Sequence, residues 1–381
     1  MLRTTSKLPD IPTSIFSVMS ALASEHQAVN LSQGFPGFPI DPHLSELVTY
    51  HMHGGKNQYA PMPGVPVLRE ALADKIQKLY GRSVDANQQI TITAGATQAI
   101  FTTISALVHP GDEVILFSPA YDCYGPTIQL AGGRCVYIPL DKNDYAIPWE
   151  EVRRQVNDHT RMIIINSPHN PSGAVLSSAD LDALEDVVEG TNIVVLSDEV
   201  YEHVIFDGRQ HYSCLAREAL VHRCMCVFSF GKVFHATGWK MGYVVGPTAL
   251  MTEFRKVHQF NVFSVNTPIQ YALADYLMNP DHYQGLGVFY QEKRDYFLHK
   301  LAGSRFDFSP AAGTYFQLLN FKKISNKADT ELATLWTKKH KIATIPVSAF
   351  YPDGEDNHVL RVCFAKDNET LDQAAEILCR L

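Results

Sequence analysis

Lys232 and Lys240 lie in the stretch SFGKVFHATGWKMGY (229–243), which otherwise consists mainly of aromatic, small and apolar residues. Apolar surroundings disfavour a charged ammonium group and lower the pKa of a lysine. A lysine amine that loses its proton is a nucleophile for carbonyl carbons and forms a Schiff base. A lysine that stays charged offers a fixed cation to an anion such as a phosphate. A reacting amine and a fixed cation for an anion are two chemical reasons for a lysine in such a stretch.

Asp198 and Tyr201 follow another apolar run, NIVVL (192–196), within the segment SDEVYEHV. We expect Asp198 to be buried, and a buried carboxylate needs a partner or remains protonated. A helix-capping aspartate beside a core tyrosine explains the pair equally well when the pair is taken alone.

Three further segments place small or polar residues after apolar runs. Gly95, Ala96 and Thr97 open an expected helix, whose free N–H groups and dipole suit a phosphate. Tyr121 suits stacking on a flat ring, and Asn170, extended because a proline follows it, carries an amide that donates or accepts. Taken singly, a tight turn or core packing explains each of these residues as well. The chain has no G-x-x-x-x-G-K-[ST] or G-x-G-x-x-G motif, which disfavours nucleoside triphosphates and dinucleotides.

The elements that position these residues alternate between apolar, β-rich runs and helical segments. The expected strands are residues 88–93, 112–118, 134–140, 161–166, 192–198 and 224–230. Near-continuous apolar runs alternating with helices predict an α/β fold with a doubly wound, mostly parallel sheet. In such sheets ligands bind beyond the carboxyl ends of the strands. Most of the residues named above directly follow one of these runs.

Together these residues offer phosphate donors, a stacking ring, an amide, a buried anion and a lysine at one sheet edge. The ligand class that needs this set is a phosphorylated aromatic aldehyde with a basic ring nitrogen, namely pyridoxal 5'-phosphate (PLP). Lys232 would form the Schiff base, and its freed amine would move the substrate α-proton to the C4′ carbon as base and then acid. Asp198 would pair with the pyridine nitrogen and keep the ring an electron sink.

The other residues have complementary predicted roles around this cofactor. Asn170 and Tyr201 would hydrogen-bond its phenolic oxygen, and Tyr121 would cover one ring face. The phosphate would be held by the residues expected around it: Gly95, Ala96, Thr97, Ser229 and Lys240.

Arg361 lies in the apolar strand HVLRVCF (358–364) and is the candidate anchor for the substrate carboxylate. A buried guanidinium suits a planar anion that it contacts with two N–H groups. A structural salt bridge explains a buried arginine equally well. The Gly/Pro-rich loop from Gly34 to Pro42 is a candidate cover for the substrate.

The 381 residues, 46% of them hydrophobic, allow one large domain and a smaller one. The pattern of elements changes near residue 280, after which we expect an α+β domain. Its expected helices are 283–302, 328–340 and 368–380, and its expected strands lie near 306–308, 314–321, 342–346 and 358–364. The predicted division is an N-terminal segment of the small domain and substrate loop (1–42), a large cofactor-binding domain (43–280) and a C-terminal small domain (281–381).

The net charge of −8 favours neither nucleic acid nor an anionic membrane as a partner. Seven cysteines, an odd number at irregular spacings, fit reduced thiols. Cys224 and Cys226 lie in an apolar run that indicates strand core, so no metal site is expected. No apolar run is long enough for a transmembrane helix, and none follows the basic N-terminal residues as in a secretory signal. We therefore expect a cytoplasmic protein.

Motifs along nearly the whole chain resemble those of the class I, fold-type-I PLP-dependent aminotransferases. The motifs are LSQGFPGFP, NQYAPMPGVPVLRE, TAGATQAI, GDEVILFSPAYDCY, NSPHNPSG, SDEVYEHVIFDG, SFGKVFHATGWKMGY and RVCFAK. NQYAPMPG, the GWK-x-G form and SVNTP (264–268) are similar to the branch that holds methionine and kynurenine–glutamine aminotransferases. The resemblance implies the PLP-transferase fold and amino-acid and 2-oxo-acid substrates.

The resemblance also implies a homodimer with two shared active sites, in which Tyr59 reaches the phosphate of the neighbouring subunit. Phe16 matches an aromatic position that lines the substrate pocket, and Gly34 matches a backbone contact to the substrate carboxylate. Lys240 stands where many members of the class carry arginine, which replaces a fork of donors by a point charge. The similar branch shares this lysine.

Two functions remain open and a third is disfavoured. The first is a transaminase that moves the amino group of methionine, or another large neutral or aromatic amino acid, to a 2-oxo acid. Kynurenine and glutamine stay possible donors because apolar pockets separate sizes by only ~1–3 kcal/mol. The second is a carbon–sulfur β-lyase for cysteine conjugates or cystathionine, using Lys232 and Asp198. A DNA-binding regulator is disfavoured because the 30 residues before LSQGFP are too few for a helix-turn-helix domain.

Overall fold

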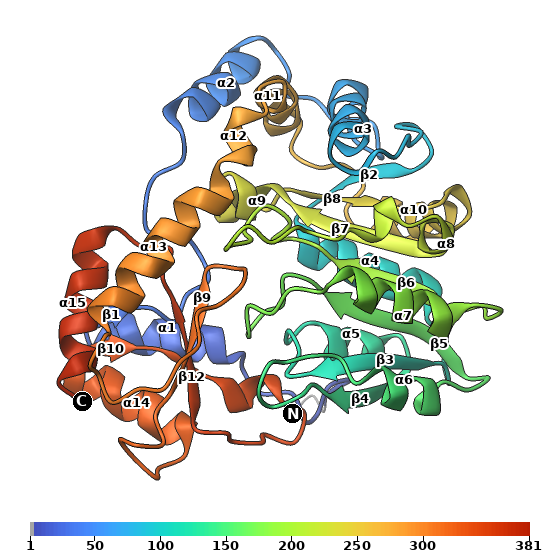
Figure 1. The fold of residues 1–381 in the computed structure, drawn as a ribbon. Coiled ribbons are helices and arrows are strands. Elements are labelled where there is room, and N and C mark those ends of the chain that lie inside the picture. The colour runs from blue at the N-terminus through green and yellow to red at the C-terminus, as the bar shows by residue number, and fades with distance from the viewer. Residues whose placement is uncertain (1–3) are drawn as a thin grey trace.

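A seven-stranded sheet forms the centre of the larger part of the molecule, in the strand order β2-β8-β7-β6-β5-β3-β4 (Figure 1). The computed structural model describes residues 4–381. The strands are β2 (Ile90–Thr93), β3 (Glu113–Ser118), β4 (Arg134–Pro139), β5 (Thr160–Asn166), β6 (Val194–Asp198), β7 (Cys224–Ser229) and β8 (Gly242–Val245). Only β8 pairs antiparallel, with β2 and β7. The predicted α/β fold with a mostly parallel sheet is confirmed.

Helices cover both faces of this sheet because successive strand residues point to opposite sides. Val114 and Val227 pack in one core with α4, α5 and α10, while their neighbours Ile115 and Cys226 pack in the other with α3, α6 and α7. The helices of this part are α2 (Pro42–His53), α3 (Pro66–Tyr80), α4 (Ala96–Leu107), α5 (Tyr124–Leu130), α6 (Trp149–Gln155), α7 (Ser178–Val188), α8 (Glu218–Val221), α9 (Phe230–Val233), α10 (Thr248–Asn261), α11 (Thr267–Leu277) and α12 (Asp281–Gln284).

The smaller part combines the two ends of the chain, which Figure 1 shows as blue and red segments side by side. Its elements are α1 (Ile15–Glu25), β1 (Val29–Asn30), α13 (Leu286–Lys300), β9 (Phe316–Asn320), α14 (Asp329–His340), β10 (Ile342–Ala343), β11 (Ile345–Pro346), β12 (Val359–Cys363) and α15 (Asn368–Cys379). β1 pairs parallel with β10, and β9, β12 and β11 form an antiparallel sheet. The exact domain boundaries at residues 42 and 280 stay a prediction.

Several predicted elements differ from the structure in extent. The sequence also predicts a short amphipathic helix over residues 14–29, but in the structure this helix ends at Glu25, because Gln27 turns into the left-handed region at φ +50° before β1 begins. The strand expected near 306–308 is a single bridge between Asp307 and Asn320. The strand expected at 342–346 is divided, because β10 and β11 pair in different sheets. β8, at residues 242–245, was not predicted.

The insertion of β8 has a direct effect on the binding edge. Because β8 runs against its neighbours, its start lies at the edge where the parallel strands end. Lys240, two residues before β8, therefore reaches the same edge as Lys232, which follows β7.

Candidate active site

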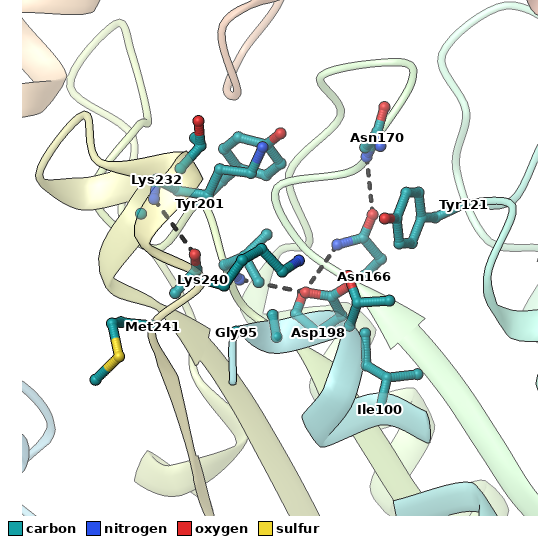
Figure 2. Close-up of a pocket in the computed structure, with 16 residues that line it drawn as sticks. Gly95, Ile100, Tyr121, Asn166, Asn170, Asp198, Tyr201, Lys232, Lys240 and Met241 are labelled. Atoms are coloured by element: carbon teal, nitrogen blue, oxygen red, sulfur yellow. Dashed lines mark hydrogen bonds between the residues drawn. The ribbon is translucent and has the colours of Figure 1, made fainter. Parts of the chain in front are cut away.

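A pocket lies where β6 and β7 end and α4 begins, at the edge that the strand pattern predicts (Figure 2). Figure 2 shows Lys232 and Tyr201 on one side, Tyr121 and Asn170 on the other, and Asp198 between them. The lining contains the following predicted cofactor residues: Gly95, Ala96, Thr97, Tyr121, Asn170, Asp198, Tyr201, Ser229, Lys232 and Lys240.

Lys232 lies on the short helix α9, whose N-terminus is capped by Ser229. The Ser229 hydroxyl accepts from the backbone N–H of Lys232 at 3.3 Å. The Lys232 Nζ donates to the Tyr315 hydroxyl at 2.9 Å and to the Gly34 carbonyl at 3.0 Å. Burial lowers the pKa of Lys232 to about 8. About a tenth of such amines are unprotonated at pH 7, so the group is available for attack on a carbonyl.

Asp198 ends β6 and is buried, as predicted. Its Oδ2 accepts from the Tyr124 hydroxyl at 2.6 Å, and its Oδ1 accepts from the Val200 N–H at 3.4 Å. Burial raises the pKa of Asp198 to about 6, against the opposing effects of these hydrogen bonds and of Lys232. The carboxylate is therefore mostly ionised at neutral pH, and a protonated ring nitrogen is a partner of matching charge.

The turn before α4 has the form of a phosphate seat. Gly95 is the N-cap at φ +80°, and no side chain caps the first-turn N–H groups of α4. A Cβ at Gly95 would lie 3.3 Å from the Lys240 Cε, so the Lys240 side chain approaches the start of the helix closely. Lys240 itself is solvent-exposed, although its neighbours in sequence are apolar. The arrangement combines N–H donors, a helix N-terminus and a cation.

Arg361 lies on β12 and is 1% exposed. Its Nη1 donates to Asn170 Oδ1 at 2.7 Å and its Nη2 to the Ser32 carbonyl at 3.3 Å, while its buried Nε has no partner. No carboxylate among residues 4–381 lies within ion-pairing distance of it, so the salt-bridge alternative finds no support. Burial lowers the pKa of Arg361 to about 10, which still leaves it charged at neutral pH. A buried cation with a free donor suits an incoming carboxylate.

Three phenyl rings surround this guanidinium. Its central carbon lies 3.8 Å from the Phe316 ring centroid, 5.1 Å from that of Phe16 and 5.2 Å from that of Phe350. The rings of Phe16 and Phe350 meet edge to face at 5.8 Å. Phe16 thus lies beside Arg361, where an apolar substrate side chain would find an aromatic wall.

Two tyrosines of the site were missed by the sequence analysis. Tyr124 holds Asp198, and Tyr315 donates to the Gly34 carbonyl at 2.8 Å while its ring meets that of Tyr201 edge to face at 5.2 Å. Burial raises the pKa of Tyr201, which keeps its hydroxyl protonated as a donor. Each missed tyrosine has an aromatic neighbour nearby in the sequence, Tyr121 or Phe316, so no local signal separates it from core packing.

Tyr59 does not join the other predicted residues. Its side chain is 82% exposed, and its ring meets that of Phe263 edge to face, with ring centroids 5.3 Å apart. Within one chain, Tyr59 is not part of the pocket lining.

The sequence matches the family "Aminotransferase class I and II" over residues 26–378. It is 48% identical to the methionine aminotransferase of Escherichia coli, over 99% of this chain and 98% of that protein. It is 36% identical to the probable N-succinyldiaminopimelate aminotransferase of Mycobacterium tuberculosis (97% and 96%) and 34% identical to the kynurenine–oxoglutarate transaminase of Dictyostelium discoideum (97% and 94%). A crystal structure of an Escherichia coli protein with methionine aminotransferase function superposes with a TM-score of 0.97, at 47% identity and full coverage of both chains.

The chain belongs to the class I and II aminotransferases and is a PLP-dependent enzyme of fold type I. The site fits this cofactor, because a buried carboxylate, an uncapped helix start with a nearby lysine, and a second lysine of lowered pKa line one pocket. Among residues 4–381, no helix is long and apolar enough to cross a membrane, and no group of three acidic, His or Cys side chains is placed to hold a metal ion.

Proposed function

We propose that the enzyme transfers the amino group of methionine, or of another large neutral or aromatic amino acid, to a 2-oxo acid. The observation that carries this proposal is Arg361, a buried cation with an unpartnered Nε, set among the rings of Phe16, Phe316 and Phe350. The anchor suits the carboxylate that every amino acid shares, while the rings suit a thioether or aromatic side chain. The similarity to the Escherichia coli methionine aminotransferase supports the same donor.

We assign the cofactor-binding roles as follows. PLP, when bound, supplies an aldehyde and a ring that accepts electrons. The Lys232 Nζ would bind the aldehyde carbon, and Asp198 would hold a proton on the ring nitrogen. The Tyr201 hydroxyl and the Asn170 Nδ2 would donate to the phenolic oxygen, because the Asn170 Oδ1 is already engaged by Arg361. Tyr121 would cover the ring, and the turn at 95–97 with Ser229 and Lys240 would hold the phosphate.

Lys232 also moves the proton during turnover. Once released by the substrate amine, its Nζ would act as the base, and burial lowers the pKa of this lysine to about 8, toward neutral pH. It would take the proton from the substrate α-carbon and deliver it to C4′, the former aldehyde carbon of the cofactor. The Tyr315 hydroxyl and the Gly34 carbonyl, which both contact Nζ, would keep it near this path.

A homodimer with shared sites is the assembly that we propose. Tyr59, Phe260 and Phe263 are 82%, 87% and 53% exposed, an unusual amount of aromatic surface for a free face. Pairing of two subunits would cover these rings and bring the Tyr59 hydroxyl to the phosphate of the neighbouring site.

The location that we propose is the cytoplasm. All seven cysteines are free, including Cys224 and Cys226, whose sulfurs lie 3.4 Å apart, and free thiols support a reducing compartment.

A panel of amino donors and 2-oxo acid acceptors on the purified holoenzyme tests the proposed reaction. The proposal predicts the highest kcat/KM with methionine or an aromatic donor, and none without an acceptor. A higher kcat/KM with kynurenine or glutamine would identify that amino acid as the preferred donor instead. Release of pyruvate and ammonia from cysteine conjugates without any acceptor would support the β-lyase alternative instead.

A further inference from the structure

Asp122 carries a carboxylate on the loop that also carries Tyr121 of the pocket. It follows Tyr121 on the loop between β3 and α5, and its Oδ2 accepts from the Ser14 hydroxyl at 3.0 Å. Ser14 is the N-cap residue of α1, two residues before Phe16. The pair therefore joins the loop that carries the ring-stacking tyrosine to the helix that carries the aromatic wall.

The same loop is tied to that wall at another point. The Ala120 N–H donates to the Phe350 carbonyl at 2.8 Å, and the Phe350 ring contacts both the Phe16 ring and the Arg361 guanidinium. A substrate whose carboxylate binds Arg361, and whose amino group lies toward Lys232, leaves its side chain to this wall. Asp122 is the acidic residue of the loop at that wall.

The charge of Asp122 is not neutralised by an ion pair. No lysine, arginine or histidine among the described residues is within ion-pairing distance of it. Burial raises the pKa of Asp122, and the Ser14 hydrogen bond and the field of Arg361 oppose this effect. An ionised Asp122 repels a second carboxylate brought near it, because like charges close together in a poorly solvated site cost free energy.

We infer that Asp122 selects substrates by the charge of their side chains. It excludes donors and acceptors that carry a second carboxylate and admits those with neutral side chains. The inference rests on the proposed amino-acid transamination and adds a specificity residue to it. Discrimination of this kind needs a repulsive element as well as attractive contacts, because apolar walls reject a misfit only weakly. Asp122 supplies the repulsion and the phenyl rings supply the attraction.

Two variants separate charge from structure. Asp122→Asn keeps the shape and an oxygen that accepts from Ser14, but removes the charge. Ser14→Ala removes the hydrogen bond and keeps the charge. We expect Asp122→Asn to raise the ratio of kcat/KM for glutamate to that for methionine by at least about tenfold, since like charges brought together cost several kcal/mol. We expect Ser14→Ala to leave this ratio within about twofold.

Inhibitor binding supplies a readout that does not depend on turnover. Glutarate and pentanoate have the same chain length and differ in one carboxylate, and their Kd values are measured by spectral titration of the holoenzyme. Asp122→Asn is expected to lower the Kd of glutarate relative to that of pentanoate by about tenfold. Two results would overturn the inference while the proposed function stands. One is that Asp122→Asn leaves both the kcat/KM ratio and the Kd ratio unchanged, and the other is that both variants lose affinity equally for all ligands. A wild-type enzyme that transaminates no neutral donor would overturn the proposed function itself.

Discussion

The Tyr124 hydroxyl donates to Asp198 Oδ2 at 2.6 Å, and both side chains are buried. This bond stabilises the ionised carboxylate against the burial that raises its pKa to about 6. Tyr124 therefore acts through Asp198 as a positioning residue, because it orients the carboxylate and preserves its charge for the cofactor.

Tyr124→Phe is expected to weaken PLP binding and to lower kcat by about ten- to a hundredfold, since hydrogen bonds to charged groups contribute ~1.5–3 kcal/mol. Equilibrium dialysis of PLP and steady-state kinetics with methionine measure the two effects. Tyr137→Phe is the matched control, because Tyr137 lies beside Gly125 of the same helix α5, whereas the tyrosine bonded to Asp198 is Tyr124. Equal behaviour of the two variants would show that Asp198 does not need this bond.

Arg361→Lys is expected to lower kcat/KM for every amino donor by about thirty- to a thousandfold, mainly through KM, because the ammonium keeps the charge and loses the fork of donors. The measurement is the donor panel on wild type and variant. A loss confined to one class of side chain would contradict a carboxylate anchor, since the carboxylate is the group that all donors share.

The rate of covalent PLP attachment to the apoprotein is expected to depend on pH through Lys232. With a pKa of about 8, its neutral fraction rises about tenfold per pH unit below that value and levels off above it. The attachment rate, followed by absorbance, should therefore rise up to about pH 8 and then flatten. Nα-acetyl-lysine with PLP is the control for the titration of PLP itself. A rate that still rises tenfold per unit between about pH 9 and 10 would indicate an unperturbed lysine.

Tyr59→Phe tests the shared site. If the hydroxyl reaches the phosphate of the neighbouring subunit, the variant should bind PLP about tenfold more weakly and remain a dimer in sedimentation. Tyr50→Phe is the control, because Tyr50 is also exposed, at 69%, and has no proposed role. An unchanged Kd for PLP, or a wild-type protein that sediments as a monomer, would remove Tyr59 from the site.

The sequence predicted the site where charge or polarity stood out against an apolar run. Lys232, Asp198 and Arg361 each interrupt such a run, and the α/β pattern correctly placed the first two at one edge of the sheet. Tyr124 and Tyr315 were not predicted, because a tyrosine with aromatic neighbours in the sequence is not distinguished locally from core packing. Their roles depend on hydrogen bonds to residues 74 and 281 positions away, to Asp198 and Gly34.

Two features of the fold were also not predicted, because they do not follow from the local sequence pattern. β8 is four residues long, and its antiparallel insertion between β2 and β7 follows from pairing rather than from local pattern. Lys240 was expected in apolar surroundings from its neighbours, yet its left-handed backbone, at φ +53°, ends a 3-10 turn, and its side chain is solvent-exposed.

Peptide mapping after borohydride reduction of the holoenzyme shows whether the Lys232 Nζ bonds covalently to PLP. We expect one cofactor adduct per chain, on Lys232, which is retained in Lys240→Ala and lost in Lys232→Ala. Transamination should be lost together with the adduct, while the circular dichroism of the fold is preserved. An adduct on a different lysine, or none in a protein that still transaminates, would exclude Lys232 as the residue that binds the cofactor.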